Sequence, residues 1–186
     1  MPSTTTSGGA ILRDATSRYR KARREEDGAH GAYDAETKRA GAAPRAEVNV
    51  SRDSAPADIA AVLGVEPGTE VAVRARKMFQ DDQLVQLADT YIPVDVAEAA
   101  GIEQVDTGVG GIISRMAEAG FAQAEVTEDV SQIEADADQA AALGVQAGDK
   151  LLQIIHTGRT DAGRAVEVTR HILGPNWTLR FSVPVA

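Results

Sequence analysis

The chain has 186 residues, of which 43% are apolar, enough for one domain of ordinary size with a buried core. It contains no cysteine, which excludes disulfides and thiolate metal sites. No apolar run approaches the roughly 18 residues of a membrane-spanning helix, and the start, MPSTTTSGGAILRD, lacks the regions of a signal peptide. We therefore expect a cytoplasmic protein with no membrane partner.

The net charge of −9 is unevenly distributed along the chain. Residues 1–45 carry nine basic and six acidic side chains, whereas residues 46–186 carry ten basic and twenty-two acidic ones. The longer part would repel a phosphate backbone, so we expect no nucleic-acid binding by it alone. The basic cluster from Arg18 to Arg24 is interpreted as a solvated linker or a frayed helix, with contact to nucleic acid or an acidic partner as the alternative.

The first 44 residues are mostly polar. Residues 1–12 have the Ser, Thr and Gly content that is typical of disordered segments. Residues 13–41 permit helices, and a short helix is predicted to begin at residues 33–36 and to end near Gly41. Pro44 marks a boundary. We therefore predict a flexible, partly helical linker over residues 1–44 and a folded domain over residues 45–186.

Strands and short helices follow one another along the folded domain. Alternation of apolar and polar residues predicts strands over residues 46–54, 69–79, 84–93, 122–135, 150–160, 165–173 and 177–185. Helices are predicted over residues 57–64, 94–100, 110–119 and 136–143, the last with Asp136 and Gln139 at capping-box spacing. This order predicts an α+β fold with a mostly antiparallel sheet flanked by helices.

Two stretches of the chain repeat one pattern. LGVEPGTEVAVRARKMFQDDQLVQLADTYI begins at Leu63, and LGVQAGDKLLQIIHTGRTDAGRAVEVTRHI begins at Leu143. Each contains a helix end, a glycine turn, a strand, a turn with aspartate and a second strand. This pattern indicates an internal duplication of a helix–hairpin unit. We expect the two copies to form one sheet with a ligand cleft between them.

Arg74 and Arg76 lie two residues apart on the strand of the first copy, so both project from one face. Two guanidinium groups on one sheet face favour an anionic ligand, because each can donate two hydrogen bonds to a carboxylate or phosphate. The alternative is a solvent-exposed face, since the opposite face, from Val71 to Lys77, is not obviously the buried one.

The second copy has an acidic residue and a histidine where the first has neutral side chains. Gln86 corresponds to Glu167, and Thr90 corresponds to His171. We predict that Thr90, Glu167 and His171 line a polar pocket opposite the arginines, and that Glu128 on a neighbouring strand is a further ligand-binding candidate. For each of these residues an exposed strand position is the alternative.

The sequence carries no pattern for a cofactor or a metal. Residues 108–111, Gly-Val-Gly-Gly, lack the spacing of a phosphate-binding loop. These residues are interpreted as a flexible turn before a helix, and an anion held at the N-terminus of that helix is the alternative. His30, His156 and His171 are too scattered for a metal cluster, and spacing indicates no Ser-His-Asp triad. We expect no cofactor and no metal.

The stretches VRARKMFQDDQLVQLADTYIP and ALGVQAGDKLLQIIHTGRTDAGRAVEVTRHIL together resemble the effector-binding domain of the HutC subfamily of GntR transcription regulators, the UTRA domain. The resemblance covers roughly residues 45–186. The preceding ATSRYRKARREEDGAHGAYDAE resembles the linker that follows the winged helix in actinobacterial members. The resemblance implies a chorismate-lyase-like fold, a small-molecule pocket and a homodimer.

The resemblance also implies roles for single residues. In the family, arginines on the first hairpin strand bind an anionic group of the effector, and Arg74 and Arg76 fall on that strand. A further basic residue often precedes the turn, where this chain has Met78. The family's Ser or Thr before Tyr-(Leu/Ile)-Pro falls on Thr90, and its acidic residue in the second hairpin falls on Glu167.

The largest departure from the family pattern is at the N-terminus. Family members begin with a winged helix-turn-helix, and no such motif precedes the linker here. This leaves two interpretations, a piece of a longer regulator or a natural protein without the DNA reader. DNA contact is therefore expected only through a winged-helix domain that is absent from this chain.

The leading hypothesis is a small-molecule sensing domain of a GntR/HutC-type regulator, which dimerises, binds an anionic metabolite and transmits binding to DNA affinity. Two alternatives stay open. One is a stand-alone enzyme of the same fold, a lyase or cyclase, with Glu128, Glu167 and His171 as acid–base candidates. The other is a dimerisation partner without a DNA reader.

Overall fold

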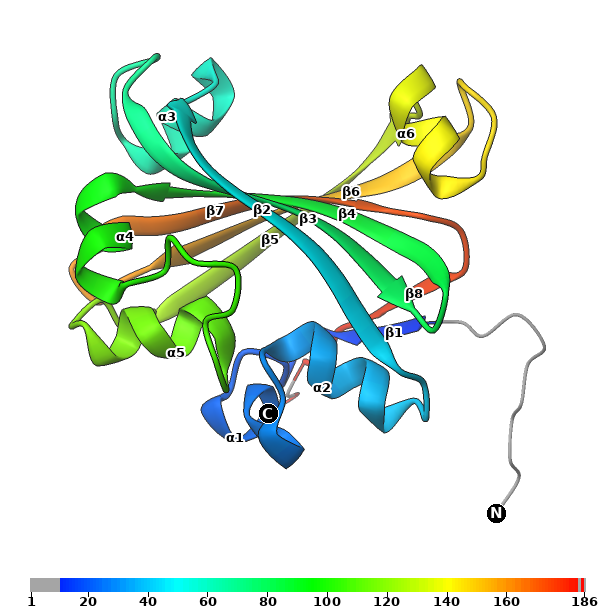
Figure 1. Cartoon of the computed structure of the whole chain (residues 1–186), viewed down its shortest axis with the longest axis horizontal. Coiled ribbons are helices and arrows are strands. Elements are labelled where there is room, and N and C mark those ends of the chain that lie inside the picture. The colour runs from blue at the N-terminus through cyan, green and yellow to red at the C-terminus, as the bar shows by residue number, and fades with distance from the viewer. Residues whose placement is uncertain (1–10, 184, 186) are drawn as a thin grey trace.

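A six-stranded antiparallel sheet forms the centre of the molecule (Figure 1). The computed structural model describes residues 11–183 and residue 185. The strand order is β2-β3-β4-β7-β6-β5, and a separate pair of parallel strands, β1 and β8, lies beside it. The predicted α+β class with a mostly antiparallel sheet is confirmed.

The elements follow the predicted order closely. The strands are β1 (Ile11–Asp14), β2 (Pro44–Ser54), β3 (Glu70–Gln80), β4 (Gln83–Pro93), β5 (Glu125–Glu134), β6 (Lys150–Arg159), β7 (Ala165–Leu173) and β8 (Trp177–Arg180). The helices are α1 (Lys21–Arg24), the 3-10 turn η1 (Glu26–Gly28), α2 (Ala32–Arg39), α3 (Ala57–Leu63), α4 (Val94–Ala100), α5 (Gly111–Glu118) and α6 (Ala137–Leu143). None of the described helices is long and apolar enough to cross a membrane.

Local sequence explains several of these boundaries. The capping box predicted at α6 is present, because the Gln139 backbone N–H donates to the Asp136 side chain at 2.8 Å and the Asp136 backbone N–H donates to the Gln139 side chain at 3.2 Å. The last strand was predicted over residues 177–185 and instead ends at Arg180. The physical reason is pairing, since β1, its partner among residues 11–183, ends opposite Arg180.

The internal duplication is visible in the backbone. α3 and α6 both end at a glycine in the left-handed conformation, Gly64 and Gly144. The Ala55 N–H donates to the Thr69 carbonyl at 2.8 Å, and eighty residues later the Ala135 N–H donates to the Asp149 carbonyl at 2.8 Å. The repeated unit therefore begins before Leu63 and Leu143 and comprises β2-α3-β3-β4 and β5-α6-β6-β7, with β4 and β7 adjacent at the centre.

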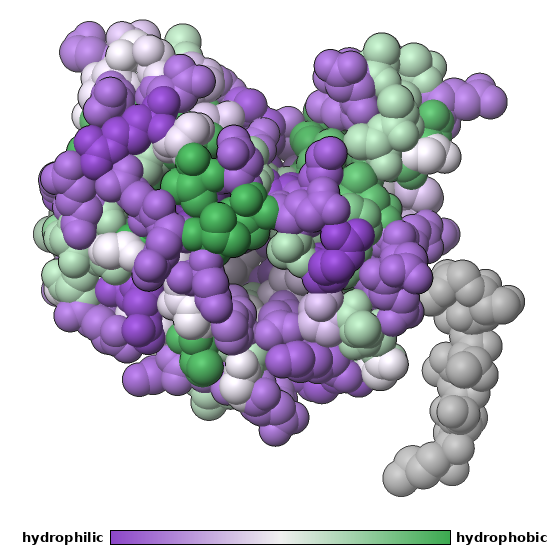
Figure 2. Space-filling model, viewed as in Figure 1, coloured by the Kyte–Doolittle hydropathy of each residue, from purple (hydrophilic) through white to green (hydrophobic). Residues whose placement is uncertain are grey.

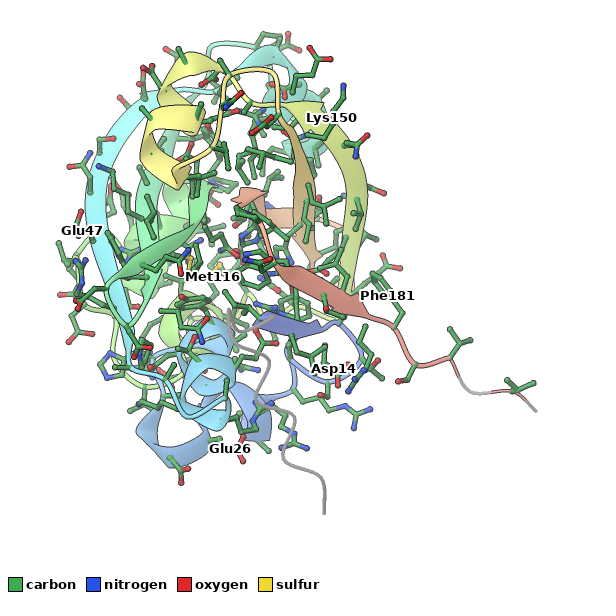
Figure 3. The ribbon with its side chains drawn as sticks, turned by 90° about the vertical axis from the view of Figure 1, so that its right-hand side faces the viewer. Asp14, Glu26, Glu47, Met116, Lys150 and Phe181 are labelled. Atoms are coloured by element: carbon green, nitrogen blue, oxygen red, sulfur yellow. The ribbon has the colours of Figure 1, made fainter. Side chains whose placement is uncertain are left out.

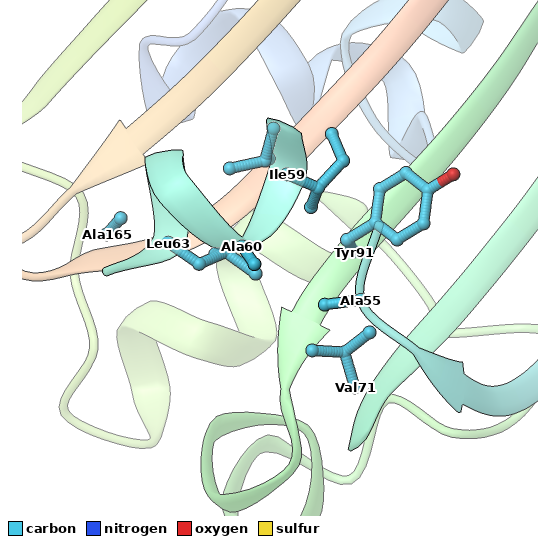
Figure 4. Packing of buried hydrophobic residues seen from close by; sticks show 8 residues of the cluster. Ala55, Ile59, Ala60, Leu63, Val71, Tyr91 and Ala165 are labelled. Carbon is cyan, nitrogen blue, oxygen red and sulfur yellow. The ribbon is translucent and has the colours of Figure 1, made fainter. Parts of the chain in front are cut away.

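Both faces of the sheet are partly covered. α3 and α6 pack on one face near its two ends, and α4, α5 and the N-terminal helices lie on the other (Figure 1). Beneath α3 the core consists of Ala55, Ile59, Ala60, Leu63, Val71, Tyr91, Ala165 and Val168 (Figure 4). On the opposite side Met116 of α5 is fully buried and lies in the interior (Figure 3).

Residues 11–43, which we call the N-terminal segment, pack against the sheet. Ile11 and Leu12 belong to β1, although the sequence placed them at the end of a disordered stretch; the rest of that stretch, residues 1–10, lies outside the described residues. Arg13 and Tyr33 are buried. The segment was expected to be a flexible linker because its sequence is mostly polar. Polar side chains are nevertheless among those that it buries, since Glu36 and Thr37 of α2 are buried.

Candidate functional site

One row of polar side chains crosses five strands on the face that α4, α5 and the N-terminal segment cover. Arg74 on β3 pairs with Thr90 on β4, Thr90 with Thr169 on β7, Thr169 with His156 on β6, and His156 with Glu128 on β5. Residues paired directly across strands project from the same face. Three of the predicted site residues thus lie in a single row.

A second row runs beside the first. Arg76 pairs with Ala88, and Ala88 pairs with His171. Glu167 precedes Thr169 by two residues and therefore projects from the same face. The structure thus brings all six predicted residues to one face: Arg74, Arg76, Thr90, Glu128, Glu167 and His171. That face is the covered one, although the sequence left an exposed face as the alternative.

Two connected hollows lie between this face and the N-terminal segment. The inner pocket has a volume of about 90 Å³ and is lined by Arg76, Gln86, His156, Glu167 and His171 among others. The outer groove has a volume of about 550 Å³ and runs between β2, α2 and residues 105–107. Arg76 lines both. In Figure 2 a hollow is visible where these elements meet, next to a hydrophobic group on an otherwise largely hydrophilic face.

The Arg76 guanidinium is the cation that is free to bind an anion. It donates to the Thr90 hydroxyl at 2.6 Å, while its buried Nε has no hydrogen-bond partner. Within the described residues, no carboxylate lies within 4.0 Å of it. Burial lowers its pKa, which means that the site penalises the charge. An anion placed beside Arg76 would remove that penalty.

Arg74 has a different set of partners. Its guanidinium donates to the backbone carbonyls of Ile102 at 2.7 Å, Gln104 at 2.5 Å and Val105 at 3.0 Å. Burial lowers its pKa to about 10. These hydrogen bonds connect Arg74 to the loop between α4 and α5, and that loop forms one wall of the outer groove. We therefore infer that Arg74 stabilises the loop and does not bind the ligand directly.

Glu167 lies at the inner end of the site. Its carboxylate accepts hydrogen bonds from the Gln123 amide at 2.7 Å and from the Thr169 hydroxyl at 2.9 Å. Burial alone would raise its pKa, but nearby His156 and these hydrogen bonds outweigh burial and lower the pKa to about 2. Gly158 permits this arrangement, since a Cβ there would lie 2.3 Å from the Gln123 side chain.

His171 packs against Gln86. The Gln86 amide nitrogen lies 3.1 Å from His171 Nδ1 and 2.8 Å from Met78 Sδ, while the buried Gln86 Oε1 has no partner. Burial, followed by the charges of Arg13 and Arg76, lowers the His171 pKa well below its usual value. His171 is therefore a neutral wall of the pocket at neutral pH.

Glu128 is occupied by the N-terminal segment. Its carboxylate accepts hydrogen bonds from Arg13 and from the Tyr19 hydroxyl, and Tyr19 in turn contacts His156 Nδ1 at 3.0 Å. Burial would raise the Glu128 pKa, but the charge of Arg13 and these bonds lower it. Tyr19, and not Glu128, lines the inner pocket.

Sequence reasoning missed the contribution of the N-terminal segment to the site. Arg18 and Tyr19 line the pocket, although they belong to the cluster interpreted as a solvated linker or a frayed helix. Arg18 is buried and forms an ion pair with Glu36 at 3.0 Å. The one available signal was a tyrosine within a run of basic residues, which alone does not distinguish a pocket wall from a linker.

The backbone N–H groups at the start of α5, considered above as the alternative anion site, have other contacts. The Gly110 N–H donates to the Ala29 carbonyl at 2.8 Å, and the Gly111 N–H donates to the Gly108 carbonyl at 3.1 Å. Gly111 has a positive φ of 65°, and a Cβ there would lie 2.8 Å from the His30 carbonyl oxygen. The glycines thus allow the N-terminal segment to approach α5 closely.

The chemistry of the site suits binding. Over residues 11–183, His, Asp and Glu side chains do not gather in any group of three that could hold a metal ion. The lowered pKa values of Glu128, Glu167 and His171 lie away from the near-neutral range that an efficient general base requires. Unpartnered polar atoms and a free guanidinium instead surround a cavity, as a polar ligand would need.

Solved structures share this architecture. PhnF from Mycobacterium smegmatis superposes with a TM-score of 0.75 at 20% identity, covering 95% of this chain and 72% of that one. A GntR-family transcriptional regulator from Bacillus cereus and the C-terminal domain of the histidine utilization repressor from Pseudomonas syringae pv. tomato each give a TM-score of 0.64 at 19% identity, covering 77% of this chain and 99% of theirs. These similarities establish a common fold. A comparison with curated protein sequences gave no match.

The family model of the UTRA domain matches residues 39–176. The match runs from the end of α2 to the turn before β8 and so includes the whole duplicated sheet and its polar rows. The chain therefore belongs to the UTRA domain family.

Proposed function

We propose that this chain is the effector-sensing domain of a GntR-type transcription regulator of the HutC group, and that its effector carries an anionic group bound by Arg76. The observation that carries the proposal is a partly buried guanidinium without a carboxylate partner at the junction of the inner pocket and the outer groove. An unpaired charge in such a place is costly unless a ligand pairs with it.

Ligand binding would be communicated through the N-terminal segment. Tyr19 and Arg18 form one wall of the pocket, and Arg13 of β1 is tied to Glu128. A ligand that contacts these side chains would favour one position of the segment over another. In a complete regulator, where a DNA-binding domain is joined to this domain, such a shift would change DNA affinity.

We further propose that the domain works as a homodimer, as regulators that bind two DNA half-sites commonly do. Two of the structural relatives are a GntR-family transcriptional regulator and a histidine utilization repressor, which is consistent with this role. Sedimentation velocity of the purified chain measures the dimer directly, and a monomer at tens of micromolar would contradict it.

A thermal-shift screen tests the anion-binding proposal. Small organic acids and phosphate esters are added to the wild type and to Arg76→Met, with Arg164→Met as a control because Arg164 is exposed and paired with Asp95. A ligand at about 100 times its Kd contributes about 2.7 kcal/mol, which raises Tm by roughly 5–10 °C in a domain of this size.

The expected result is that at least one anion stabilises the wild type and Arg164→Met, but not Arg76→Met. Equal stabilisation of Arg76→Met would contradict the role of Arg76. The absence of any stabilising anion would contradict the sensing function.

A further inference from the structure

We propose that the inner pocket binds a zwitterion, with a carboxylate at Arg76 and an ammonium group at a cluster of three acceptors, His156 Nε2, Gln86 Oε1 and Glu167 Oε2. This inference rests on the proposed function and narrows its ligand to molecules that carry an amine and an acid a few atoms apart, as α-amino acids do. Any larger part of the ligand would occupy the outer groove.

The hydrogen bonds of Tyr19 fix the tautomer of His156. Ionised Glu128 can only accept, so the single hydroxyl proton of Tyr19 points to it. Tyr19 must then accept from His156 Nδ1, 3.0 Å away, which places a ring proton on Nδ1. When the ring carries this one proton, Nε2 is an acceptor, and this buried atom has no hydrogen-bond partner.

The other two acceptors belong to residues that line the same pocket. Gln86 Oε1 is buried and unpartnered, and the Gln86 amide nitrogen contacts Met78 and His171. Glu167 Oε2 lies 3.6 Å from His156 Nε2, too far for a hydrogen bond and close enough for two acceptors to oppose each other unfavourably. A donor placed between them would satisfy both.

Charge identifies that donor as a cation. Within the described residues the ion pairs Arg13–Glu128 and Arg18–Glu36 are internally neutral, and Arg76 and Glu167 are opposite charges that do not touch each other. His156 lies 3.6 Å from Glu167 and pairs with it as a charge only when both ring nitrogens are protonated. With the single ring proton on Nδ1, a ligand with one negative and one positive group neutralises Arg76 and Glu167, whereas a simple anion leaves Glu167 without a cationic partner. An ammonium group also supplies three N–H donors, one for each acceptor of the cluster.

The size of the inner pocket matches such a group. At about 10–15 Å³ for each water-sized group, a volume of about 90 Å³ holds roughly six to nine of them. Alanine has six non-hydrogen atoms, and lactate has the same shape with a hydroxyl group in place of the ammonium group. Comparing the affinities of alanine and lactate therefore measures what the ammonium group contributes to binding.

The test is a titration by calorimetry at pH 8 with four probes: alanine, lactate, propanoate and ethylamine, with both enantiomers of the first two. Hydrogen bonds to charged groups are strong enough that alanine should bind about tenfold or more tightly than lactate and propanoate. Ethylamine, which lacks the carboxylate, should bind least. Glu167→Gln should reduce the preference for alanine over lactate to about threefold or less.

Glu134→Gln serves as the matched control, because Glu134 is exposed on β5 and pairs only with Lys150. If Glu167→Gln does not fold, as judged by circular dichroism, Gln86→Leu replaces it and should weaken alanine binding several-fold without weakening lactate binding. Lactate or propanoate binding as tightly as alanine would overturn the zwitterion and leave the anion-sensing function intact. If none of the four probes binds, the zwitterion proposal fails, and the thermal-shift screen alone decides the anion-sensing function.

Discussion

Arg74 and Arg76 are two residues apart, yet the structure gives them opposite tasks. Arg74 satisfies three backbone carbonyls of the loop after α4, whereas Arg76 has a hydroxyl as its only hydrogen-bond partner among the described residues. From the sequence we predicted the same role for both arginines. Alternation along a strand predicts that two side chains share a face, but it does not predict which other residues pack against that face. The distinction depends on residues 102–105, which reach Arg74 from another part of the chain.

This difference predicts opposite effects on stability. Arg74→Ala leaves three carbonyls without their donor, that of buried Ile102 among them, and should lower the free energy of unfolding by about 2–4 kcal/mol. Arg76→Met removes an unpaired, partly buried charge, so the ligand-free protein should keep its stability or gain about 1 kcal/mol. Urea unfolding of the two variants and the wild type checks the pair. A larger loss for Arg76→Met than for Arg74→Ala would contradict these assignments.

His171 makes stability depend on pH. Its pKa is lowered in the folded state, so below the ordinary histidine value of about 6.5 the unfolded chain binds a proton that the folded chain does not. The stability from neutral His171 is therefore fully present above about pH 6.5 and is lost as pH falls below it, at about 1.4 kcal/mol per pH unit.

His171→Gln removes this titration. Between pH 7.5 and 5.5 the wild type should lose about 1.4 kcal/mol more of its free energy of unfolding than the variant does. Chemical denaturation at the two pH values measures the difference, and parallel losses in both proteins would show that His171 is protonated when folded.

At the scale of elements, the N-terminal segment is a wall of the site. β1 adds a parallel strand to β8, and its Arg13 reaches across to Glu128 on β5. Sequence patterns did not reveal this packing because part of it is ionic, and because its main apolar contacts come from Ile11 and Tyr33, two residues far apart in the segment that form no periodic pattern. The predicted elements of the duplicated sheet, by contrast, depended on apolar alternation and glycine turns, and they were confirmed within a few residues.

The ion pair between β1 and β5 can be measured by a double-mutant cycle. Arg13→Met alone leaves buried Glu128 without its cation and should cost about 3–5 kcal/mol, whereas adding Glu128→Leu should recover a large part of that loss. Thermal or urea unfolding of the four proteins gives the coupling. Additive losses would mean that the two side chains do not stabilise each other.

For the whole molecule, the sequence was sufficient for the fold class and for the duplication, but not for the layout of the site. β3 carries Val71 and Val73 on one face and Ala72, Arg74 and Arg76 on the other, and both faces are partly covered. Hydrophobic patterning cannot choose between two covered faces. The position of the pocket became clear only from the structure, in which the pairing of five strands aligns the pocket residues in rows.

The proposed function requires that the pocket at Arg76 binds a small molecule with an anionic group. To test this, the purified wild type and Arg76→Met are incubated with the same mixture of small metabolites, bound molecules are separated from free ones by gel filtration, and the bound ones are identified by mass spectrometry. The wild type is expected to retain at least one acid that Arg76→Met does not. Retention of no acid by the wild type, or of the same acids by both proteins, would contradict it.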